Sequence, residues 1–138
     1  MFRKIILFIC FSLMGTSLSF ADGVGTAGPS QFPQRDGEAL YQALCQSCHM
    51  PEGKGAVGAG HYPPLAKNDN LISSMFLAEF IIYGQRGMPG FGGVLDDAQV
   101  VELVNYIRSH FGNNYQEKIT EDHVHFIRKP DYEYVDMD

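Results

Sequence analysis

The sequence predicts an all-α domain with three main helices joined by long loops. Three segments carry apolar residues at helical spacing, and stretches rich in glycine and proline separate them. No segment shows the alternating pattern of a strand pair, and no internal repeat is present. The chain has 138 residues, which suits one domain, because domains commonly contain about 100–150 residues.

The chain before the first helix is predicted to lie outside the folded domain. Residues 1–21 combine a basic start at Arg3 and Lys4, an apolar run and a small-residue ending at Ala21, the pattern of a secretory signal peptide. The apolar run is too short for a membrane-spanning helix, so no span is expected after its removal. Residues 22–35 are rich in glycine, proline, serine and threonine, and we interpret them as a flexible leader.

The first helix is expected to begin at Asp36, whose side chain suits the N-cap position. Leu40 and Leu44 are four residues apart and therefore lie on one face of this helix. The helix is expected to end near Met50, after a motif of two cysteines and a histidine. Residues 51–64 are rich in glycine and proline and are predicted to form a loop.

The second helix is predicted from Ser73 or Ser74 to Tyr83. Its large apolar residues fall on one side, as in a helix that packs against a core. Gly84 suits the position just past a helix C-terminus. Residues 84–93 then form a second loop, which holds a methionine between a glycine and a proline.

The third helix begins with a capping-box pattern formed by Asp96 and Gln99. Apolar residues then follow a spacing of about 3.6 residues as far as Phe111. Residues 112–114, Gly-Asn-Asn, are expected to end this helix.

Residues 116–138 form an acidic C-terminal tail with seven acidic and three basic residues. They show only a weak helical pattern over residues 124–127. This composition fits a solvated, partly disordered end. Apolar side chains such as Phe126 and Tyr132 instead favour a docking segment, which folds back on the domain or binds a basic patch of a partner protein.

Charge and cysteine content exclude several classes of protein. The chain has ten basic and sixteen acidic residues, a formal charge of −6, which becomes −8 once residues 1–21 and their two bases are removed. Proteins that bind nucleic acid or anionic membranes carry the opposite sign. A disulfide framework is equally disfavoured, because Cys10 lies in the signal and only Cys45 and Cys48 remain.

Cys45, Cys48 and His49 form a Cys-x-x-Cys-His motif, the pattern of covalent haem attachment. Two thiols three positions apart can bond the two vinyl groups of one haem, and His49 then supplies an axial ligand to the iron. A thiol–disulfide motif instead occurs beside a βαβ pattern, and a zinc site needs a second pair of ligands. Neither context is present in the sequence.

Met88 is the expected second axial ligand of the iron. Glycines in Gly87-Met88-Pro89-Gly90 permit close approach to a porphyrin, and the proline stiffens the loop. The other methionines lie in the signal, in the tail, in a predicted helix or too close to His49. A thioether ligand favours Fe(II). Six ligands leave no open position for a substrate, which indicates an electron carrier and not an enzyme.

A ligating histidine usually donates its other ring N–H to a carbonyl or a carboxylate. The loop Tyr62-Pro63-Pro64-Leu65 can supply such a carbonyl, so Pro63 and Leu65 are candidate haem-pocket residues. An ordinary loop stiffened by two prolines fits these residues equally well. The remaining histidines are expected at the surface: His61, His110, His123 and His125.

These features resemble the class I c-type cytochromes, which are monohaem proteins with a small haem-wrapping fold of three to five helices. The resemblance covers residues 36–115 as a cytochrome c domain. Gly37 and Tyr41 resemble the packing pattern of the family's first helix, and Leu103 and Tyr106 resemble its partner on the last helix.

Three segments are most similar to the cytochrome subunits or domains that serve periplasmic quinoprotein alcohol and sugar dehydrogenases: residues 63–65, 87–92 and 104–113. Similar loops occur in other bacterial cytochromes c, including oxidase-associated ones. The resemblance implies a periplasmic electron-transfer protein with one covalent haem c, held by Cys45 and Cys48 and ligated by His49 and Met88.

Electrons are then expected to come from a redox partner such as a quinoprotein dehydrogenase and to pass to a terminal oxidase or another cytochrome of the respiratory chain. The chain itself is expected to be a carrier, either free or as a subunit of a dehydrogenase or oxidase complex. Two alternatives belong to other functional classes. One is a five-coordinate haem protein that binds a gas or acts as a peroxidase, and the other is a thiol oxidoreductase without haem.

Overall fold

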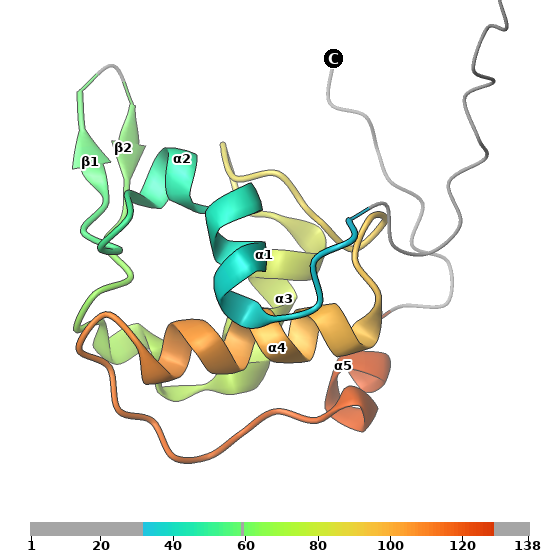
Figure 1. Ribbon diagram of the computed structural model, residues 1–138. Coiled ribbons are helices and arrows are strands. Elements are labelled where there is room, and N and C mark those ends of the chain that lie inside the picture. Colours follow the sequence, from blue (N-terminus) through green and yellow to red (C-terminus); the bar gives the residue numbers. More distant parts are fainter. Residues whose placement is uncertain (1–31, 59, 129–138) are drawn as a thin grey trace, which may run out of the picture.

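The computed structural model describes residues 32–58 and 60–128 (Figure 1). The predicted signal peptide, most of the predicted leader and the end of the tail from residue 129 lie outside these residues. The described chain contains the helices α1 (Gly37–Leu44), α2 (Gln46–His49), α3 (Ser74–Tyr83), α4 (Asp97–Ser109) and α5 (Glu121–Ile127). The remaining elements are the 3-10 helix η1 (Asp69–Ile72) and the strands β1 (Ala56–Val57) and β2 (His61–Tyr62). Within the described ranges, no helix has both the length and the hydropathy that a membrane span requires.

The ends of the three main helices α1, α3 and α4 follow local signals in the sequence. Asp36 and Ser73 each accept a hydrogen bond from the backbone N–H three residues further on. Both hydrogen bonds of the capping box between Asp96 and Gln99 are present. Gly84, with a φ of 72°, ends α3. The predicted all-α class with three main helices is confirmed.

Two helix boundaries differ from the sequence prediction. Cys45 ends α1 and caps α2, so the helix predicted as far as Met50 is divided in two. α4 ends at Ser109, before Phe111, which has a φ of 58°. This conformation allows the ring of Phe111 to pack on Tyr41 with a centroid separation of 4.7 Å. A contact between distant parts of the chain therefore overrides the local helical pattern.

A short antiparallel hairpin lies within the first glycine-rich loop, with Ala56 opposite Tyr62 and Val57 opposite His61. The expectation that the chain has no strand pair is wrong. Strands of two residues are too short to produce an alternating pattern that a sequence can reveal. Gly55 has a φ of 65°, and a Cβ there would lie 2.2 Å from the carbonyl oxygen of Tyr62, so the close approach requires glycine.

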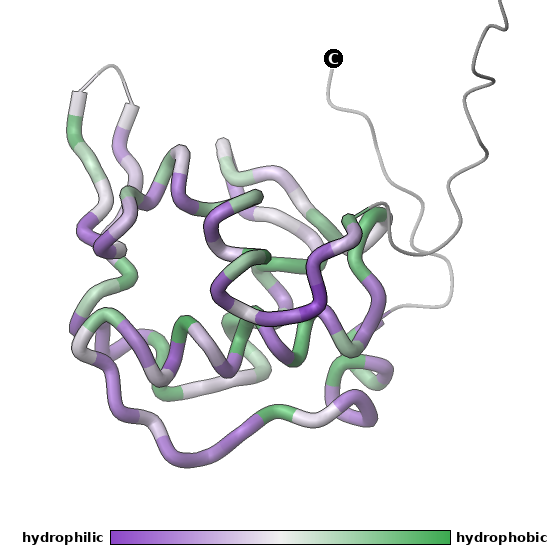
Figure 2. The backbone as a smooth tube through the Cα atoms, in the orientation of Figure 1, coloured by the Kyte–Doolittle hydropathy of each residue, from purple (hydrophilic) through white to green (hydrophobic). Residues whose placement is uncertain are grey.

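The core forms where α1 crosses α4 (Figure 1). A Cβ at Gly37 would lie 2.4 Å from both the carbonyl oxygen of Glu102 and the Cβ of Tyr106, so only glycine allows the two backbones to approach this closely. The rings of Tyr41 and Tyr106 pack beside this contact, with centroids 5.9 Å apart. Apolar residues recur between polar ones along α4 (Figure 2), as expected of a helix with one buried face.

Residues 116–128 pack against the helical core. After α4 the chain runs back along that helix to α5, which contacts both α3 and α4 (Figure 1). Ile119 and Val124 are buried, whereas Phe126 is 81% exposed. Residues 116–128 therefore fold back on the domain, one of the two forms expected of a docking segment. The expectation that Phe126 anchors the segment to the domain is wrong, because its side chain is exposed.

The end of the predicted leader also contacts the domain. The side-chain amide of Gln99 donates hydrogen bonds to the carbonyl oxygens of Phe32 and Gln34, at 2.8 and 2.7 Å. Arg35 forms an ion pair with Asp96. The chain that precedes α1 is thus fixed at the first turn of α4.

Replacing Asp96 with alanine is expected to lower the free energy of unfolding by about 1 kcal/mol at neutral pH, because an N-cap contributes about this much. Partial burial alone would raise the pKa of the Asp96 carboxyl, but the Gln99 N–H and the Arg35 guanidinium hold it below its ordinary value of 3.8. A lowered folded-state pKa stabilises the protein above the unfolded-state pKa, and this contribution disappears as the pH falls through the folded-state pKa.

Urea unfolding of wild type and Asp96→Ala, at neutral pH and well below the ordinary carboxyl pKa, measures this difference. The gap between the two proteins should narrow in acid. A gap of the same size under both conditions would contradict an electrostatic contribution from Asp96.

Candidate functional site

The junction of α1 and α2 places the three residues of the Cys-x-x-Cys-His motif together. The backbone N–H groups of Cys48 and His49 both donate to the carbonyl oxygen of Cys45, at 3.1 and 2.8 Å, which closes one short helical turn. Cys45 is buried in the core, His49 is also buried, and Cys48 is half-buried. Both thiols are free.

The His49 ring is oriented by the loop that follows β2. Its Nδ1–H donates to the carbonyl oxygen of Pro63 at 2.9 Å. The loop predicted to offer a carbonyl to the histidine makes this contact, which commits one ring nitrogen. The other nitrogen, Nε2, is therefore the one available to a metal ion.

The loop that carries Pro63 is itself tied to the chain after α2. The carbonyl oxygen of Gly53 accepts hydrogen bonds from the N–H groups of Leu65 and Ala66, at 2.7 and 2.8 Å. Leu65 is buried in the core. The position of the Pro63 carbonyl, and with it the orientation of the His49 ring, is thus set by backbone hydrogen bonds.

Met88 lies in the loop between α3 and α4. Its backbone exchanges two hydrogen bonds of 3.0 Å with Gln85. Further along, the N–H groups of Phe91 and Gly92 donate to carbonyl oxygens in the last turn of α3, at 2.8 and 3.0 Å. A Cβ at Gly84 would lie 2.5 Å from the Met88 carbonyl oxygen, so the loop folds tightly against the end of α3.

The structure brings His49 and Pro63 into direct contact. Cys45 and Leu65 belong to one apolar core, and Met88 is half-buried and packs against that same core. Met88 reaches this core from a loop separate from the one that carries the motif.

These residues fit a haem c. Cys45 and Cys48 are free thiols at the spacing that attachment requires. His49 presents one uncommitted ring nitrogen. Met88 adds a thioether on a loop whose backbone is fixed on both sides.

Residues 32–107 match the family described as cytochrome c oxidase, cbb3-type, subunit III. The match covers more than half of the chain and includes the Cys-x-x-Cys-His motif and Met88. The chain belongs to this family of c-type cytochrome domains. The resemblance stated from the sequence is confirmed, and a mostly helical chain with one very short hairpin is consistent with a small cytochrome c fold.

Similar proteins include cytochrome subunits of dehydrogenases. The chain is 36% identical over 108 residues to the fructose dehydrogenase cytochrome subunit of Gluconobacter japonicus, which aligns 67% of this chain with 22% of that protein. It is 29% identical over 128 residues to the cytochrome c subunit of alcohol dehydrogenase (quinone) of Gluconobacter oxydans, covering 83% of this chain and 26% of the relative. The chain thus spans about a quarter of the length of these two relatives.

A smaller relative is cytochrome c6 of a Synechococcus species. It is 32% identical over an alignment of 84 residues that covers 58% of this chain and 72% of that protein. The similarity therefore extends to a cytochrome of small size as well as to parts of longer subunits.

The Cys45 thiol does not lie in the environment of a reactive cysteine. Burial, with a smaller contribution from the neighbouring Cys48, raises the pKa of the Cys45 thiol to about 12. Thiol–disulfide catalysis requires a cysteine with a lowered pKa, which is a thiolate at neutral pH. The raised pKa of Cys45 is therefore the opposite of what an attacking cysteine requires.

Two residues that position the site are not identified as such by the sequence analysis. The Tyr41 hydroxyl donates to the carbonyl oxygen of Met50 at 2.6 Å, just after the motif. Burial raises the pKa of Tyr41 to about 12, so the hydroxyl stays protonated at neutral pH. The buried Asn113 amide donates to the carbonyl oxygens of Leu65 and Ile107, at 2.9 Å each. From the sequence alone, Asn113 is expected only to help end a helix, because its contact with Leu65 depends on the fold.

The four other histidines are exposed, as expected. His110 stacks on the Tyr106 ring with centroids 4.1 Å apart, and His123 takes part in the capping box of α5. In the described part of the chain, no group of three histidine, cysteine or acidic residues could hold a metal ion. All four of these residues are exposed side chains: His61, His110, His123 and His125.

Proposed function

We propose that this cytochrome domain is an electron-transfer protein that carries one covalently bound haem c. In this proposal Cys45 and Cys48 form the two thioether bonds, and His49 and Met88 are the axial ligands. The hydrogen bond from His49 to the Pro63 carbonyl is the single observation that carries the proposal, since it leaves Nε2 of a buried histidine free beside two free cysteines.

Each residue has a distinct task. The cysteines would hold the group at the end of α2, where Cys45 is buried in the core. His49 is held in one tautomer by Pro63, which also makes its Nε2 a better ligand. Met88 completes the ligand set from a loop fixed to α3. A bound haem iron supplies one-electron oxidation and reduction.

Ligation by both His49 and Met88 favours an electron carrier over an enzyme, because no position remains for a substrate. The dehydrogenase cytochrome subunits among the relatives support a partnership of the same kind. We infer that electrons come from a dehydrogenase, such as a quinoprotein dehydrogenase, and pass to a terminal oxidase or another cytochrome. The signal-like residues 1–21 support a periplasmic location for this exchange.

An absorption spectrum of the purified protein, together with its mass, tests the proposal. We expect the mass to increase by one haem and the spectrum to be low-spin, with a weak red band from the iron–methionine bond. A high-spin, CO-reactive resting protein would support the five-coordinate alternative. A colourless protein would support the alternative without haem.

Met88→Ala is expected to keep the covalent haem but lose the weak red band and gain CO binding. The reduction potential should fall by on the order of 0.1 V, a fraction of the roughly 0.8 V range over which axial ligands set haem potentials. Spectroscopy and a redox titration measure both effects.

Met75→Ala is the matched control, because Met75 lies in the first turn of α3 and is 38% exposed. It should leave the band and the potential unchanged. If Met88→Ala also behaves like wild type, Met88 is not an axial ligand.

A further inference from the structure

The end of α5 contacts both sides of the loop that carries Met88. On one side, the hydroxyl of Tyr83, the last residue of α3, donates to the carbonyl oxygen of Ile127 at 2.8 Å. On the other side, Arg128 donates to the carbonyl oxygens of Gly92 and Leu95, at 2.6 and 2.7 Å. Two consecutive residues of the C-terminal segment therefore hold the residue just before this loop and the downstream part of the loop itself.

Arg128 uses all three nitrogen atoms of its guanidinium group in contacts of this kind. Nη1 and Nη2 bind the two carbonyl oxygens, and Nε binds Asp97 at the start of α4. The side chain is only 22% exposed. A planar guanidinium can satisfy three acceptors at fixed angles, whereas a lysine ammonium is a single point of charge.

Gly92 is held through both its backbone N–H and its carbonyl oxygen. Its N–H donates to the Ile82 carbonyl oxygen in α3 at 3.0 Å, and its own carbonyl oxygen accepts from Arg128. The downstream end of the Met88 loop is thus fixed between α3 and the C-terminal segment. Movement of this end requires that both hydrogen bonds break.

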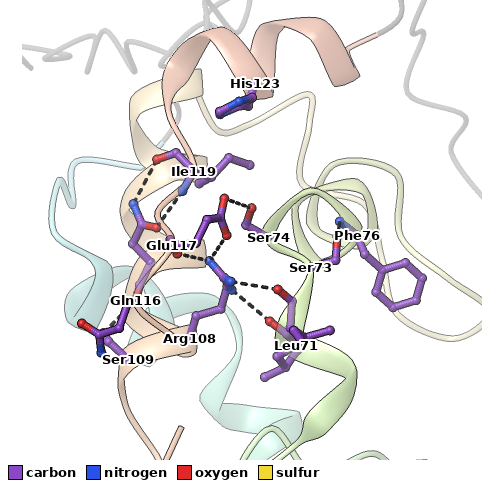
Figure 3. A network of polar contacts seen from close by, with 12 residues as sticks. Leu71, Ser73, Ser74, Phe76, Arg108, Ser109, Gln116, Glu117, Ile119 and His123 are labelled. Atoms are coloured by element: carbon purple, nitrogen blue, oxygen red, sulfur yellow. Dashed lines mark hydrogen bonds and ion pairs between the residues drawn. The ribbon is translucent and has the colours of Figure 1, made fainter. Parts of the chain in front are cut away.

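The C-terminal segment is itself anchored before it reaches the loop. Glu117 accepts a hydrogen bond from the Ser74 hydroxyl at 2.9 Å and forms an ion pair of 2.8 Å with the buried Arg108 (Figure 3). Two residues further on, the backbone of Ile119 exchanges hydrogen bonds with the Asn105 side chain. We refer to residues 117–128 as the C-terminal strap.

The strap lies beyond residues 32–107, the part of the chain that matches the family. It connects α4 to the loop that carries Met88, and two of its own residues, Ile119 and Val124, are buried against the core.

We propose that the C-terminal strap holds the Met88 loop in its closed position, and that Arg128 is the positioning residue that fixes it. This inference rests on the proposed ligation by Met88. Arg128 does not touch the ligand side chain; it limits how often the loop opens by tying Gly92 and Leu95 to α4. The strap thereby keeps the methionine in place against competing ligands.

The test compares Arg128→Ala and Tyr83→Phe with wild type in the full-length holoprotein. Arg35→Ala is the matched control, because Arg35 also pairs with an aspartate at the start of α4 but is 63% exposed and lies on the leader side. Two quantities are measured: amide hydrogen exchange over residues 84–95, and the rate at which cyanide displaces the methionine ligand from the oxidised protein.

We expect both rates to rise about tenfold in Arg128→Ala, the effect of losing hydrogen bonds from a charged donor. Tyr83→Phe should produce a smaller rise, and Arg35→Ala should stay within about twofold of wild type. If Arg128→Ala does not fold, Arg128→Lys takes its place, with the same direction expected because lysine cannot serve the three acceptors.

Rates in the Arg128 and Tyr83 variants equal to those of Arg35→Ala would overturn the proposed role of the strap. A failure of the strap proposal can be distinguished from a failure of the proposed function by the wild-type spectrum. A wild-type spectrum without an iron–methionine band would overturn the ligation by Met88, and the strap proposal with it.

Discussion

Replacing both Cys45 and Cys48 with alanine is expected to give a colourless protein without a cooperative thermal transition. Under the proposed function both covalent bonds to the haem are lost at once, and Cys45 is also one of the buried residues of the core. A small domain with long loops depends on its cofactor for much of its buried apolar surface. Mass spectrometry measures the attached haem, and circular dichroism measures the thermal transition.

Ser47→Ala is the matched control, because Ser47 is the exposed residue between the two cysteines and its replacement keeps the motif intact. This variant should retain the haem and melt like wild type. A double cysteine variant that is colourless but still melts cooperatively would show that the chain folds without its cofactor.

Replacing Arg108 with alanine is expected to lower the free energy of unfolding by about 3–4 kcal/mol, because a charged, buried hydrogen-bond donor is lost. The Arg108 side chain is 2% exposed and donates to the carbonyl oxygens of Leu71, Ile72 and Glu117 (Figure 3). These carbonyl groups lose a shared donor at a junction where η1, α4 and the C-terminal strap meet. Urea unfolding of the holoprotein measures the loss.

Glu117→Ala separates the ion pair from the carbonyl contacts. The Glu117 side chain is 59% exposed, so its removal should cost less than about 1 kcal/mol. If the two variants are equally destabilised, the ion pair and not the set of carbonyl contacts accounts for the stability of the junction.

The helices could be predicted from the sequence because their signals are local. Ser73, Asp96 and Gln99 act on backbone groups within three residues of themselves, and Gly84 ends α3 through its own conformation. The hydrogen bond between His49 and the Pro63 loop could also be predicted from the sequence, but for a different reason. The chemistry of a ligating histidine demands an acceptor, and a nearby proline-rich loop offers one.

The rest of the site depends on contacts between distant residues. Asn113 meets Leu65 across 48 positions, and Arg128 meets Gly92 across 36. No periodicity or cap marks such partners. Phe111 is the opposite case, in which a local pattern misleads. Its apolar spacing predicts that the helix continues, but it packs on Tyr41 with a positive φ that is not helical.

Both ends of the described chain meet at the first turn of α4. Arg35 and Asp96 are paired there, and the neighbouring Asp97 is paired with Arg128. Chain ends that lie close together make a domain easy to insert into another protein or to permute circularly. By this argument, a second module joined before residue 32 or after residue 128 would attach at the same corner of the domain.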